Sequence, residues 1–490
     1  MAIKKKLFEI LDDNLIQQHF GELDVEIDEL KLDSRQVNQG DVYFAISGYA
    51  ADGHDYIESA IEKGARVIIC EKIDFTFHRR VTIVQVEDSR GVMATMAASF
   101  YDFPSEDVKL IGVTGTNGKT TIATLLFQLY SKIGYKTGLI STVEIKIADR
   151  VIPATHTTPD VINLNRLIRQ MVDEDCTYIF MEVSSHAIDQ RRIEGLTFNA
   201  GLFTNMSRDH LDYHKTFKEY IWAKKKFFDH LPSDAFTLVN MDDKRGEVMI
   251  QNTKASKKSY ALKSHADYKA KIISNEINGL QMIVDDVEAH FQLVGEFNGY
   301  NLLLVYACAV ELGEDKNNVL TLLSAIKGAE GRFEKISNEH LGIHGIVDYA
   351  HTPDALSNVL STIDRVKAQN SRIITVVGCG GDRDRGKRSV MARIATEYSY
   401  LAIFTSDNPR SEDPEKILDD MDHGLGEDAD LIRVRISDRR KAIAYAVDQA
   451  KKGDVILIAG KGHEKYQEIN GKKFPFDDKK ILREAMLEVL

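Results

Sequence analysis

The stretch IGVTGTNGKTT at residues 111–121 lies between an apolar, strand-like run and a helical pattern. In a loop of this kind, backbone N–H groups and a helix N-terminus converge on phosphate oxygens, a Lys adds charge and a Thr hydroxyl reaches Mg²⁺. The residues that supply these parts are Gly115, Gly118, Lys119 and Thr120. Val113 stands where the pattern G-x-x-x-x-G-K-[ST] has its first glycine. The stretch predicts a phosphate-binding loop, with an ordinary glycine turn as the alternative.

The composition is that of a globular enzyme. The chain has 490 residues, of which 43% are hydrophobic and 28% charged, and this length allows about three domains. The net charge of −12 argues against a nucleic-acid partner. The apolar runs are shorter than the roughly 18–20 residues of a membrane span, the N-terminus does not resemble a signal peptide, and the scattered cysteines suggest neither disulfides nor zinc. We expect a cytoplasmic protein, without a membrane or nucleic-acid partner, that acts as a monomer.

The alternation of strand-like and helical segments predicts an α/β fold with three domains. Residues 1–106 are expected to form a small α/β domain, and residues 107–332 a central parallel-sheet domain built around the phosphate-binding loop. Residues 333–490 are expected to form a Rossmann-like domain. Within the central region, residues 256–295 alternate polar and apolar side chains and predict a small antiparallel insert.

The loop G-T-N-G-K-T resembles the ATP-binding loop of the Mur ligases and folylpolyglutamate synthases, in which the missing glycine is no defect. Further segments resemble Mur ligases in the same order over essentially all 490 residues, and within that family they are most similar to the enzyme that adds the third amino acid to UDP-N-acetylmuramoyl-L-Ala-D-Glu. The resemblance implies an ATP- and Mg²⁺-dependent amide ligase of peptidoglycan precursor synthesis. The loop residues that it implies for ATP are Gly115, Thr116, Asn117, Gly118, Lys119, Thr120 and Thr121.

Metal-binding residues are expected beyond the loop, besides Thr120. Glu182, in MEVSSH at residues 181–186, ends a predicted strand, where α/β folds place ligands, and its oxygens suit Mg²⁺; a helix cap is the alternative. The segment NMSRDHLDYH at residues 205–214 resembles a Mur ligase loop in which the position of His210 binds a second Mg²⁺. For His214 we expect a structural or orienting role.

Lys224 lies in the run YIWAKKK, which by itself is typical of a solvated, basic helix face. The resemblance implies instead that Lys224 reacts with CO₂ to form a carbamate that binds metal. Such a reaction needs a neutral amine, which nearby positive charges such as Lys225 and Lys226 would favour. Lys119, Glu182, His210 and Lys224 are therefore the expected catalytic residues.

Other segments that resemble the family imply the remaining substrate contacts. Asn298 and Asn301 are expected beside the adenine, Arg332 on the phosphates and Asp348 on the ribose, with helix capping as the alternative for Asn298. The UDP pocket is implied at Leu32, Ser34, Tyr49, Ala50 and Ala51. Contacts with the anionic muramoyl-dipeptide are implied at His156, Thr157, Thr158, Ser184, Gln190 and Arg192, although a T-T-P turn is often only structural.

The segment TSDNPR at residues 405–410 indicates which amino acid is added. Relatives that add meso-diaminopimelate carry D-N-P-R, whereas those that add L-lysine usually have a small residue in place of the Arg. A guanidinium can bind the far carboxylate of diaminopimelate and would repel the ammonium of lysine, so Arg410 selects diaminopimelate. The rest of the implied site is Arg383, Asp407, Asn408, Pro409, Gly460 and Glu464, of which Glu464 would accept the distal ammonium.

The implied reaction transfers the γ-phosphate of ATP to the free carboxylate of D-Glu, after which the amine attacks the acyl phosphate. Lys119 and Mg²⁺ would offset the charge on the phosphoryl group. Closure of the C-terminal domain is expected to assemble the site, and no residue is identified as the base for the amine. The alternatives are a lysine-adding ligase, a folylpolyglutamate synthase and a GTPase switch. Arg410 argues against the lysine-adding ligase, and the UDP-like N-terminal segments argue against folylpolyglutamate synthase. A GTPase would normally need an N-K-x-D motif to bind its base, and the chain contains no Asn-Lys pair.

Overall fold

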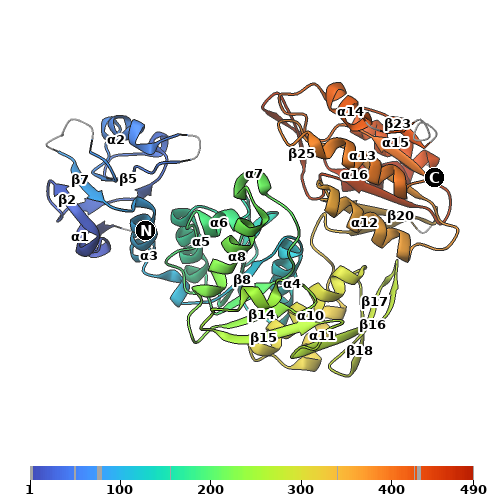
Figure 1. The fold of residues 1–490 in the computed structure, drawn as a ribbon, viewed down its shortest axis with the longest axis horizontal. Coiled ribbons are helices and arrows are strands. Elements are labelled where there is room, and N and C mark those ends of the chain that lie inside the picture. Colours follow the sequence, from blue (N-terminus) through green and yellow to red (C-terminus); the bar gives the residue numbers. More distant parts are fainter. Residues whose placement is uncertain are drawn as a thin grey trace. The chain divides into compact units, whose positions relative to one another are not determined.

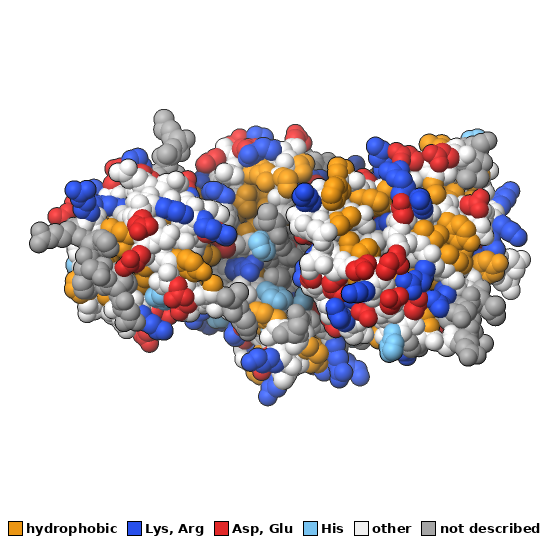
Figure 2. All heavy atoms as spheres, turned by 90° about the horizontal axis from the view of Figure 1, so that it is seen from above, with side chains coloured by type: hydrophobic (Ala, Val, Ile, Leu, Met, Phe, Trp, Pro, Cys, Tyr) orange, Lys and Arg blue, Asp and Glu red, His pale blue; other side chains and the backbone are white. Residues whose placement is uncertain are grey.

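The structure is a computed structural model and describes residues 4–48, 51–73, 80–154, 156–338, 340–423, 425–426 and 432–488. It contains two compact units, Met1–Asp267 and Tyr268–Leu490. Helices cover mainly parallel sheets (Figure 1), so the predicted α/β class is confirmed. Charged side chains of both signs are interspersed on the visible face (Figure 2). No helix in the described ranges has the length and apolar character that a membrane crossing requires.

The first sheet of unit one is built by the N-terminal residues and has the order β2-β7-β6-β5-β4. Its strands are β2 (Ile16–Phe20), β4 (Leu30–Lys31), β5 (Val42–Phe44), β6 (Val67–Cys70) and β7 (Thr82–Val86). The pairs from β4 to β7 are parallel, and β2 is antiparallel at one edge. The accompanying elements are β1 (Lys5–Lys6), α1 (Leu7–Ile10), β3 (Glu26–Ile27), α2 (Ile57–Glu62) and α3 (Ser89–Phe100).

Eight further strands of unit one belong to an 11-stranded sheet and follow one another in it in the order β11-β10-β9-β12-β8-β13-β14-β15. These strands are β8 (Lys109–Thr114), β9 (Thr137–Ile140), β10 (Glu144–Ile147), β11 (Arg150–Pro153), β12 (Tyr178–Glu182), β13 (Ala200–Phe203), β14 (Phe236–Asn240) and β15 (Ser256–Ala261). The strands β9, β12, β8, β13, β14 and β15 pair in parallel with their neighbours in this order. β10 and β11 form a hairpin that pairs with β9 in the antiparallel direction. The strand order reverses beside β8, and this is the point at which open α/β sheets bind ligands.

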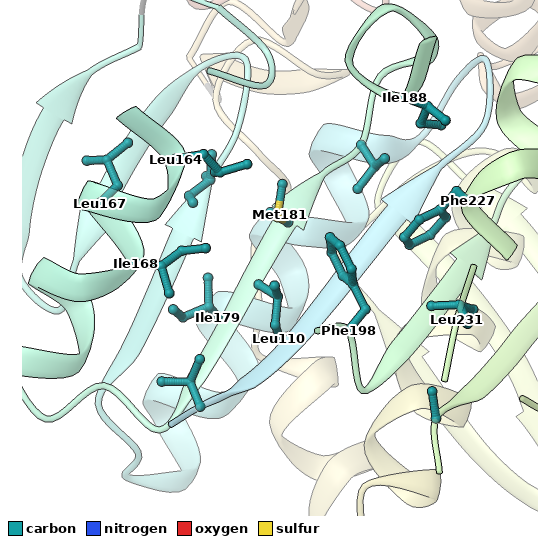
Figure 3. Packing of buried hydrophobic residues seen from close by; sticks show 14 of the residues in the cluster. Leu110, Leu164, Leu167, Ile168, Ile179, Met181, Ile188, Phe198, Phe227 and Leu231 are labelled. Atoms are coloured by element: carbon teal, nitrogen blue, oxygen red, sulfur yellow. The ribbon is translucent and has the colours of Figure 1, made fainter. Parts of the chain in front are cut away.

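The helices around this sheet bury apolar stripes. They are α4 (Lys119–Ile133), α5 (Val161–Asp173), α6 (Ser185–Asp189), α7 (Leu211–His214), α8 (Phe217–Asp229) and α9 (Gly246–Met249). On α5, Leu164, Leu167, Ile168 and Met171 follow the i, i+3, i+4, i+7 spacing of one helix face. They pack with Ile179 in one buried cluster (Figure 3), and each such side chain contributes about 1.5–3 kcal/mol on burial. This packing fixes the strand ends that carry the polar residues described below.

The predicted antiparallel insert at residues 256–295 is partly wrong. β15 pairs in parallel with β14, so it extends the parallel sheet. The following strands β16 (Tyr268–Glu276), β17 (Gly279–Val284) and β18 (Val287–Phe291) are antiparallel, as predicted, and lie in unit two. Alternation could not reveal the difference, because side chains alternate along every strand whatever its direction.

Unit two also contains a sheet of order β19-β20-β24-β21-β22-β23. Its strands are β19 (Glu334–Asn338), β20 (Ile343–Asp348), β21 (Ile373–Val377), β22 (Leu401–Phe404), β23 (Arg433–Arg435) and β24 (Val455–Ala459). All of these pairs are parallel except the edge strand β19, which the sequence did not predict. Apolar clusters cover both faces, as expected of a Rossmann-like sheet.

The remaining elements of unit two are its helices and one hairpin. The helices are α10 (Glu296–Glu311), α11 (Lys316–Ser324), α12 (Pro353–Val366), α13 (Gly386–Tyr398), α14 (Pro414–Asp422), α15 (Arg439–Gln449) and α16 (Asp478–Glu488). The hairpin consists of β25 (Tyr466–Ile469) and β26 (Lys472–Pro475). It is linked to the segment D-N-P-R by a single parallel bridge between Arg410 and Ile469.

Candidate active site

The phosphate-binding loop joins the C-terminal end of β8 to the N-terminus of α4. Val113 belongs to β8, where it is buried and pairs with Glu182 and Leu202. The chain turns only at Gly115, whose φ is +144°, and α4 begins after Gly118, whose φ is +90°. Because the position that lacks glycine lies in regular strand, a β-branched residue suits it.

Position 115 requires glycine for two reasons, because its φ is positive and because no room is left for a Cβ atom. A Cβ atom there would lie 1.9 Å from Thr204 Oγ1, whereas a Cβ atom at Gly134, with a φ of +115°, would have no neighbour within 4 Å. We expect Gly115→Ala to lower the free energy of unfolding by about 2–5 kcal/mol, and Gly134→Ala by about 1–2 kcal/mol because only backbone strain is added. Urea denaturation of both variants measures the difference. Equal losses would contradict the close contact with Thr204.

Residues after β13 hold the loop from outside it. The N–H of Thr116 donates to the carbonyl of Asn205 at 2.8 Å, and the N–H of Asn117 donates to Asn205 Oδ1 at 3.0 Å. Thr204 Oγ1 donates to the Asn117 carbonyl at 2.6 Å, and the hydroxyls of Thr116 and Tyr220 are 3.2 Å apart. Thr204, Asn205 and Tyr220 were not predicted from the sequence, although Asn205 and Tyr220 lie in the quoted segments NMSRDHLDYH and YIWAKKK.

Two lysines converge on the carbonyls of the loop. Lys119 Nζ donates to the Gly115 carbonyl at 3.0 Å and to the Thr116 carbonyl at 2.7 Å. Lys224 Nζ, from α8, donates to the same Gly115 carbonyl at 2.8 Å. It lies 4.9 Å from the ring centroid of Tyr220, and the Lys224 residue is only 1% exposed. Burial, and then the charge of Lys119, lower the pKa of Lys224 well below its ordinary value of 10.5.

The interpretation of the lysine run as a solvated face is wrong. Lys224 and Lys225 are buried, and Lys225 Nζ forms an ion pair with Asp229 at 2.5 Å. Of the three lysines, Lys226 alone is exposed, with a side-chain exposure of 54%. The positive charge that lowers the pKa of Lys224 is that of Lys119, not that of the sequence neighbours. Packing against the sheet, which a run of lysines does not reveal, decides which of them is buried.

Glu182 ends β12 with its carboxylate buried beside Thr142. Oε1 accepts the N–H of Thr142 at 2.7 Å, and Oε2 accepts the Thr142 hydroxyl at 3.3 Å. The helix-cap alternative for Glu182 is wrong, because Ser184 caps α6 and accepts the N–H of Ala187. The carboxylate is therefore oriented by Thr142, a residue that the sequence analysis did not identify.

The two histidines of the loop 205–214 differ in their surroundings. His210 precedes α7 with a φ of +53°, and its side chain is 46% exposed. Its ring centroid lies 4.8 Å from that of His186. His214 is buried, and its Nε2 is 2.9 Å from Ser185 Oγ, while burial lowers its pKa. His214 thus makes a structural contact, and His210 reaches solvent.

The oxygen atoms at this site suit an Mg²⁺ ion that also binds water and phosphate, rather than a metal ion held by protein side chains alone. Within the described ranges, no three His, Cys, Asp or Glu side chains are grouped to hold a metal ion. Mg²⁺ usually keeps several waters and uses one or two carboxylates together with substrate phosphates. Glu182 at the end of β12 and Thr120 at the start of α4 offer oxygen atoms of this kind.

Most residues expected to bind the muramoyl-dipeptide meet around Thr158. Thr158 Oγ1 donates to the Glu182 carbonyl at 2.8 Å, and Arg192 Nη1 donates to the Thr158 carbonyl at 2.8 Å. Arg192 also donates to Gln190 Oε1, and the Ser184 N–H donates to Thr158 Oγ1. Thr157 accepts a hydrogen bond from the Thr142 hydroxyl, and His156 precedes it in the chain. This group therefore lies against the Glu182 strand end.

The residues expected at the UDP pocket lie on loops of the first sheet. Leu32 is exposed, while Ser34 is buried and its carbonyl accepts from Lys63 Nζ at 3.1 Å. The Ala51 carbonyl accepts from the N–H of Gly48 at 2.9 Å. Tyr49 and Ala50 lie outside the described residues. No hydrogen bond or ion pair between described residues joins Leu32, Ser34 or Ala51 to the group around Thr158.

In unit two, the residues expected around ATP are held by internal hydrogen bonds. Asn301 Nδ2 donates to Asn298 Oδ1 at 3.0 Å, and Asn298 Nδ2 donates to the Val294 carbonyl at 2.8 Å. The capping alternative for Asn298 is wrong, because α10 is preceded by Gly295 and Asn298 lies within the helix. Asp348 accepts the N–H groups of Phe333 and Ala350 at 2.6 and 2.8 Å, and burial raises its pKa. Arg332 Cζ lies 4.8 Å from the ring centroid of Tyr349.

The residues expected to bind the amino acid are brought together in unit two. Arg410 has a φ of +52°, and its Nη1 donates to the Gly381 carbonyl at 2.7 Å. A Cβ at Gly380 would lie 2.9 Å from Arg410 Nη1 and 3.8 Å from Arg383 Cγ, so both guanidinium-bearing residues flank this turn. Asn408 Nδ2 donates to Glu464 Oε2 at 2.8 Å.

Further contacts hold this group. At Gly460, a Cβ would lie 2.6 Å from Asp407 Oδ2. The Arg410 N–H donates to the Glu468 carbonyl, and Arg410 Nε lies 3.6 Å from Glu468 Oε2. Pro409 connects Asn408 to Arg410 and its carbonyl lies close to Gly381. Glu468, for which the chain gave no signal, was not predicted from the sequence, and neither was Lys461, which lies between Gly460 and Glu464.

Comparison with known proteins gives the family. Three family models match: "Mur ligase family, catalytic domain" at residues 26–101, "Mur ligase middle domain" at 113–310 and "Mur ligase, glutamate ligase domain" at 331–462. A protein from Cytophaga hutchinsonii named "UDP-N-acetylmuramoyl-L-alanyl-D-glutamate--2,6-diaminopimelate ligase" is 54% identical over 95% of this chain and 96% of its own. The chain belongs to the Mur ligase family.

Other relatives of this Mur ligase agree with that assignment. A protein of the same name from Parabacteroides distasonis is 52% identical, over 95% of each chain. A solved structure of a protein with this name has 32% sequence identity and a TM-score of 0.67, and the match covers 94% of this chain and 95% of the other. The resemblance stated from the loop and the following segments is thereby confirmed.

Proposed function

We propose that this Mur ligase joins meso-diaminopimelate to UDP-N-acetylmuramoyl-L-Ala-D-Glu with consumption of ATP, in peptidoglycan precursor synthesis. The observation that carries the proposal is that Arg410 contacts the turn Gly380–Gly381, while Asn408 from the same segment donates to Glu464. The relatives named as diaminopimelate ligases support it.

The charges at this turn suit the far end of diaminopimelate, which carries a carboxylate and an ammonium. The Arg410 guanidinium is fixed through Nη1, and Arg383 also lies beside Gly380, so two cationic residues are available to a far carboxylate. Glu464 supplies a carboxylate for the far ammonium. L-lysine has no far carboxylate, and Arg410 would repel its ammonium.

The loop and strand ends of unit one account for the use of ATP. Backbone N–H groups at the start of α4 and the Lys119 ammonium bind phosphate oxygens, and the γ-phosphoryl group passes to the D-Glu carboxylate. The product of this step is an acyl phosphate. The neutral amine of diaminopimelate then attacks the acyl carbon, the C–N bond forms, the C–O bond to phosphate breaks, and the amine proton is lost.

Mg²⁺ would be held by Thr120, Glu182, His210 and a carbamate on Lys224. When bound, Mg²⁺ offsets negative charge on the phosphates. The carbamate is supported by burial of Lys224, by its lowered pKa, which favours the neutral amine, and by its lack of an ion pair among the described residues. Lys225 is less suited, since its Nζ already forms an ion pair with Asp229.

The same proposal divides the chain into a UDP-binding domain at 1–106, an ATP-binding domain at 107–332 and an amino-acid-binding domain at 333–490. Two of the three family matches fall inside these ranges, and the third, at 331–462, begins two residues before the last range. We also place the enzyme in the cytoplasm, where ATP is supplied, as a monomer.

Phosphate release from ATP tests the function. The purified protein is given Mg²⁺, UDP-N-acetylmuramoyl-L-Ala-D-Glu and either meso-diaminopimelate or L-lysine. We expect turnover with diaminopimelate and little with lysine. The reverse preference would retain a ligase and overturn the assignment of Arg410, while no turnover with either amino acid would overturn the proposed substrates.

A further inference from the structure

Lys461 is a buried cation inside the amino-acid site that the proposed reaction does not use. It follows β24, between Gly460 and Gly462, and the residue is 0% exposed. Its Nζ donates to Asn408 Oδ1 at 2.9 Å and to Glu464 Oε2 at 3.1 Å. Removing an ammonium from water costs several kcal/mol unless well-placed partners compensate. Nζ also lies 5.5 Å from the ring centroid of Tyr466, so two hydrogen bonds and an aromatic face stabilise the buried charge.

The contacts of Glu464 leave one of its oxygens available. Asn408 Nδ2 and Lys461 Nζ both donate to Oε2, at 2.8 and 3.1 Å. Within the described part of the chain, Oε1 has no hydrogen-bond partner, and the side chain is 16% exposed. The carboxylate is therefore anchored through one oxygen and presents the other.

Lys461 also determines which way the Asn408 amide points. An ammonium can only donate hydrogen bonds, so the Asn408 atom next to it must be the carbonyl oxygen. The same Oδ1 accepts the N–H of Glu468 at 2.9 Å. With the oxygen held from two sides, the NH₂ group is directed to Glu464, and this reinforces the anchoring of Oε2.

The backbone beneath Lys461 is fixed as well. Arg439 and Asp478 form an ion pair in which both side chains are 0% exposed. Arg439 Nη2 also donates to the Ala459 carbonyl at 2.9 Å, and the N–H of Gly460 donates to the Asp348 carbonyl at 3.1 Å. Selective binding requires side chains that are held to within about 0.5 Å by the residues that support them, and these contacts provide such support.

We propose that Lys461 is a positioning residue for amino-acid selection, which anchors Glu464 through Oε2 and directs Oε1 toward the second ammonium of the substrate. This inference rests on the proposed function, because it concerns the same amino-acid site. Lys461 itself does not touch the substrate. Its effect is a preference for amino acids that carry an ammonium at the far end as well as a carboxylate.

The test compares two substrates that differ only at that ammonium. L-2-aminopimelate has the carbon chain and both carboxylates of diaminopimelate but lacks the second amine. We expect the wild-type enzyme to prefer diaminopimelate in kcat/KM, and Lys461→Met to lower this preference roughly ten-fold or more, the usual effect of losing a charged hydrogen bond. KM values for ATP and for the UDP substrate should stay as in the wild type.

Lys465→Met is the matched control. Its ammonium lies in the same segment, is 61% exposed and pairs with Glu330 at 3.1 Å, so its loss should leave the preference unchanged. Glu464→Gln removes the acceptor itself. In the double variant Lys461→Met/Glu464→Gln, the preference should fall no further than in Glu464→Gln alone, because both changes act through the same oxygen.

A purely structural role for Lys461 predicts a different result. Lys461→Met would then lower kcat/KM for both amino acids by the same factor, and this outcome overturns the inference. If Lys461→Met does not fold, Lys461→Gln is measured instead, and an unchanged preference in that variant overturns the inference too. Absence of turnover with diaminopimelate in the wild type would overturn the proposed function itself, which is a separate result.

Discussion

Lys224→Met is expected to lower kcat for ligation by roughly 10²–10³-fold, the usual cost of removing one group that stabilises charge in a transition state. The change deletes the amine that we propose forms the carbamate, and methionine fills a similar volume beside Thr114 and Gly115. Phosphate release at saturating substrates measures the effect. Thermal unfolding should show no loss of stability, because a buried amine with a lowered pKa gives way to an apolar side chain.

The neighbouring lysines provide controls for Lys224. Lys226→Met should retain full activity, because its side chain is 54% exposed. With ¹³C-labelled bicarbonate, an NMR carbamate signal should be present in the wild type, in Lys225→Met and in Lys226→Met, and absent in Lys224→Met. A signal that survives in Lys224→Met, or full activity of that variant, would refute the carbamate at this position.

Arg410→Ala is expected to lower kcat/KM for diaminopimelate by roughly 10²-fold, the effect of truncating one partner of a buried, hydrogen-bonded charge pair. Use of L-lysine should stay the same or rise, because the repulsion between two cations is removed. The φ of +52° at this residue strains Ala and Arg alike, so the backbone cost is unchanged by the substitution. Steady-state kinetics with both amino acids give the change in selectivity.

Arg435→Ala is a suitable control for Arg410→Ala. Arg435 lies in the same unit and forms ion pairs with three acidic residues of α14, Glu415, Asp419 and Asp422. Its loss should leave the preference for diaminopimelate intact. Unchanged selectivity in Arg410→Ala would remove the argument from D-N-P-R, whereas a loss of selectivity in both variants would point to a general disturbance of unit two.

Features that are encoded locally could be predicted from the chain alone. An apolar run, two glycines and a helical pattern were enough to predict β8, the loop and α4, because each signal acts within a few residues. The alternation of strand-like and helical segments predicted the α/β fold, which the structure confirms. The order of the family segments predicted the Mur ligase family, which the comparisons confirm. The role of Arg410 was predicted from a similarly short segment, because its charge has a direct chemical meaning, and it stays a prediction.

Features that depend on distant partners became visible only in the folded molecule. β15 joins the parallel sheet because β14 lies beside it, a choice that alternation of side chains does not encode. Lys224 is buried against a loop 109 positions earlier in the chain, and Lys461 meets Asn408 across 53 positions. Burial, a lowered pKa and the orientation of a carboxylate are properties of such packed neighbours, so they arise only when the chain has folded.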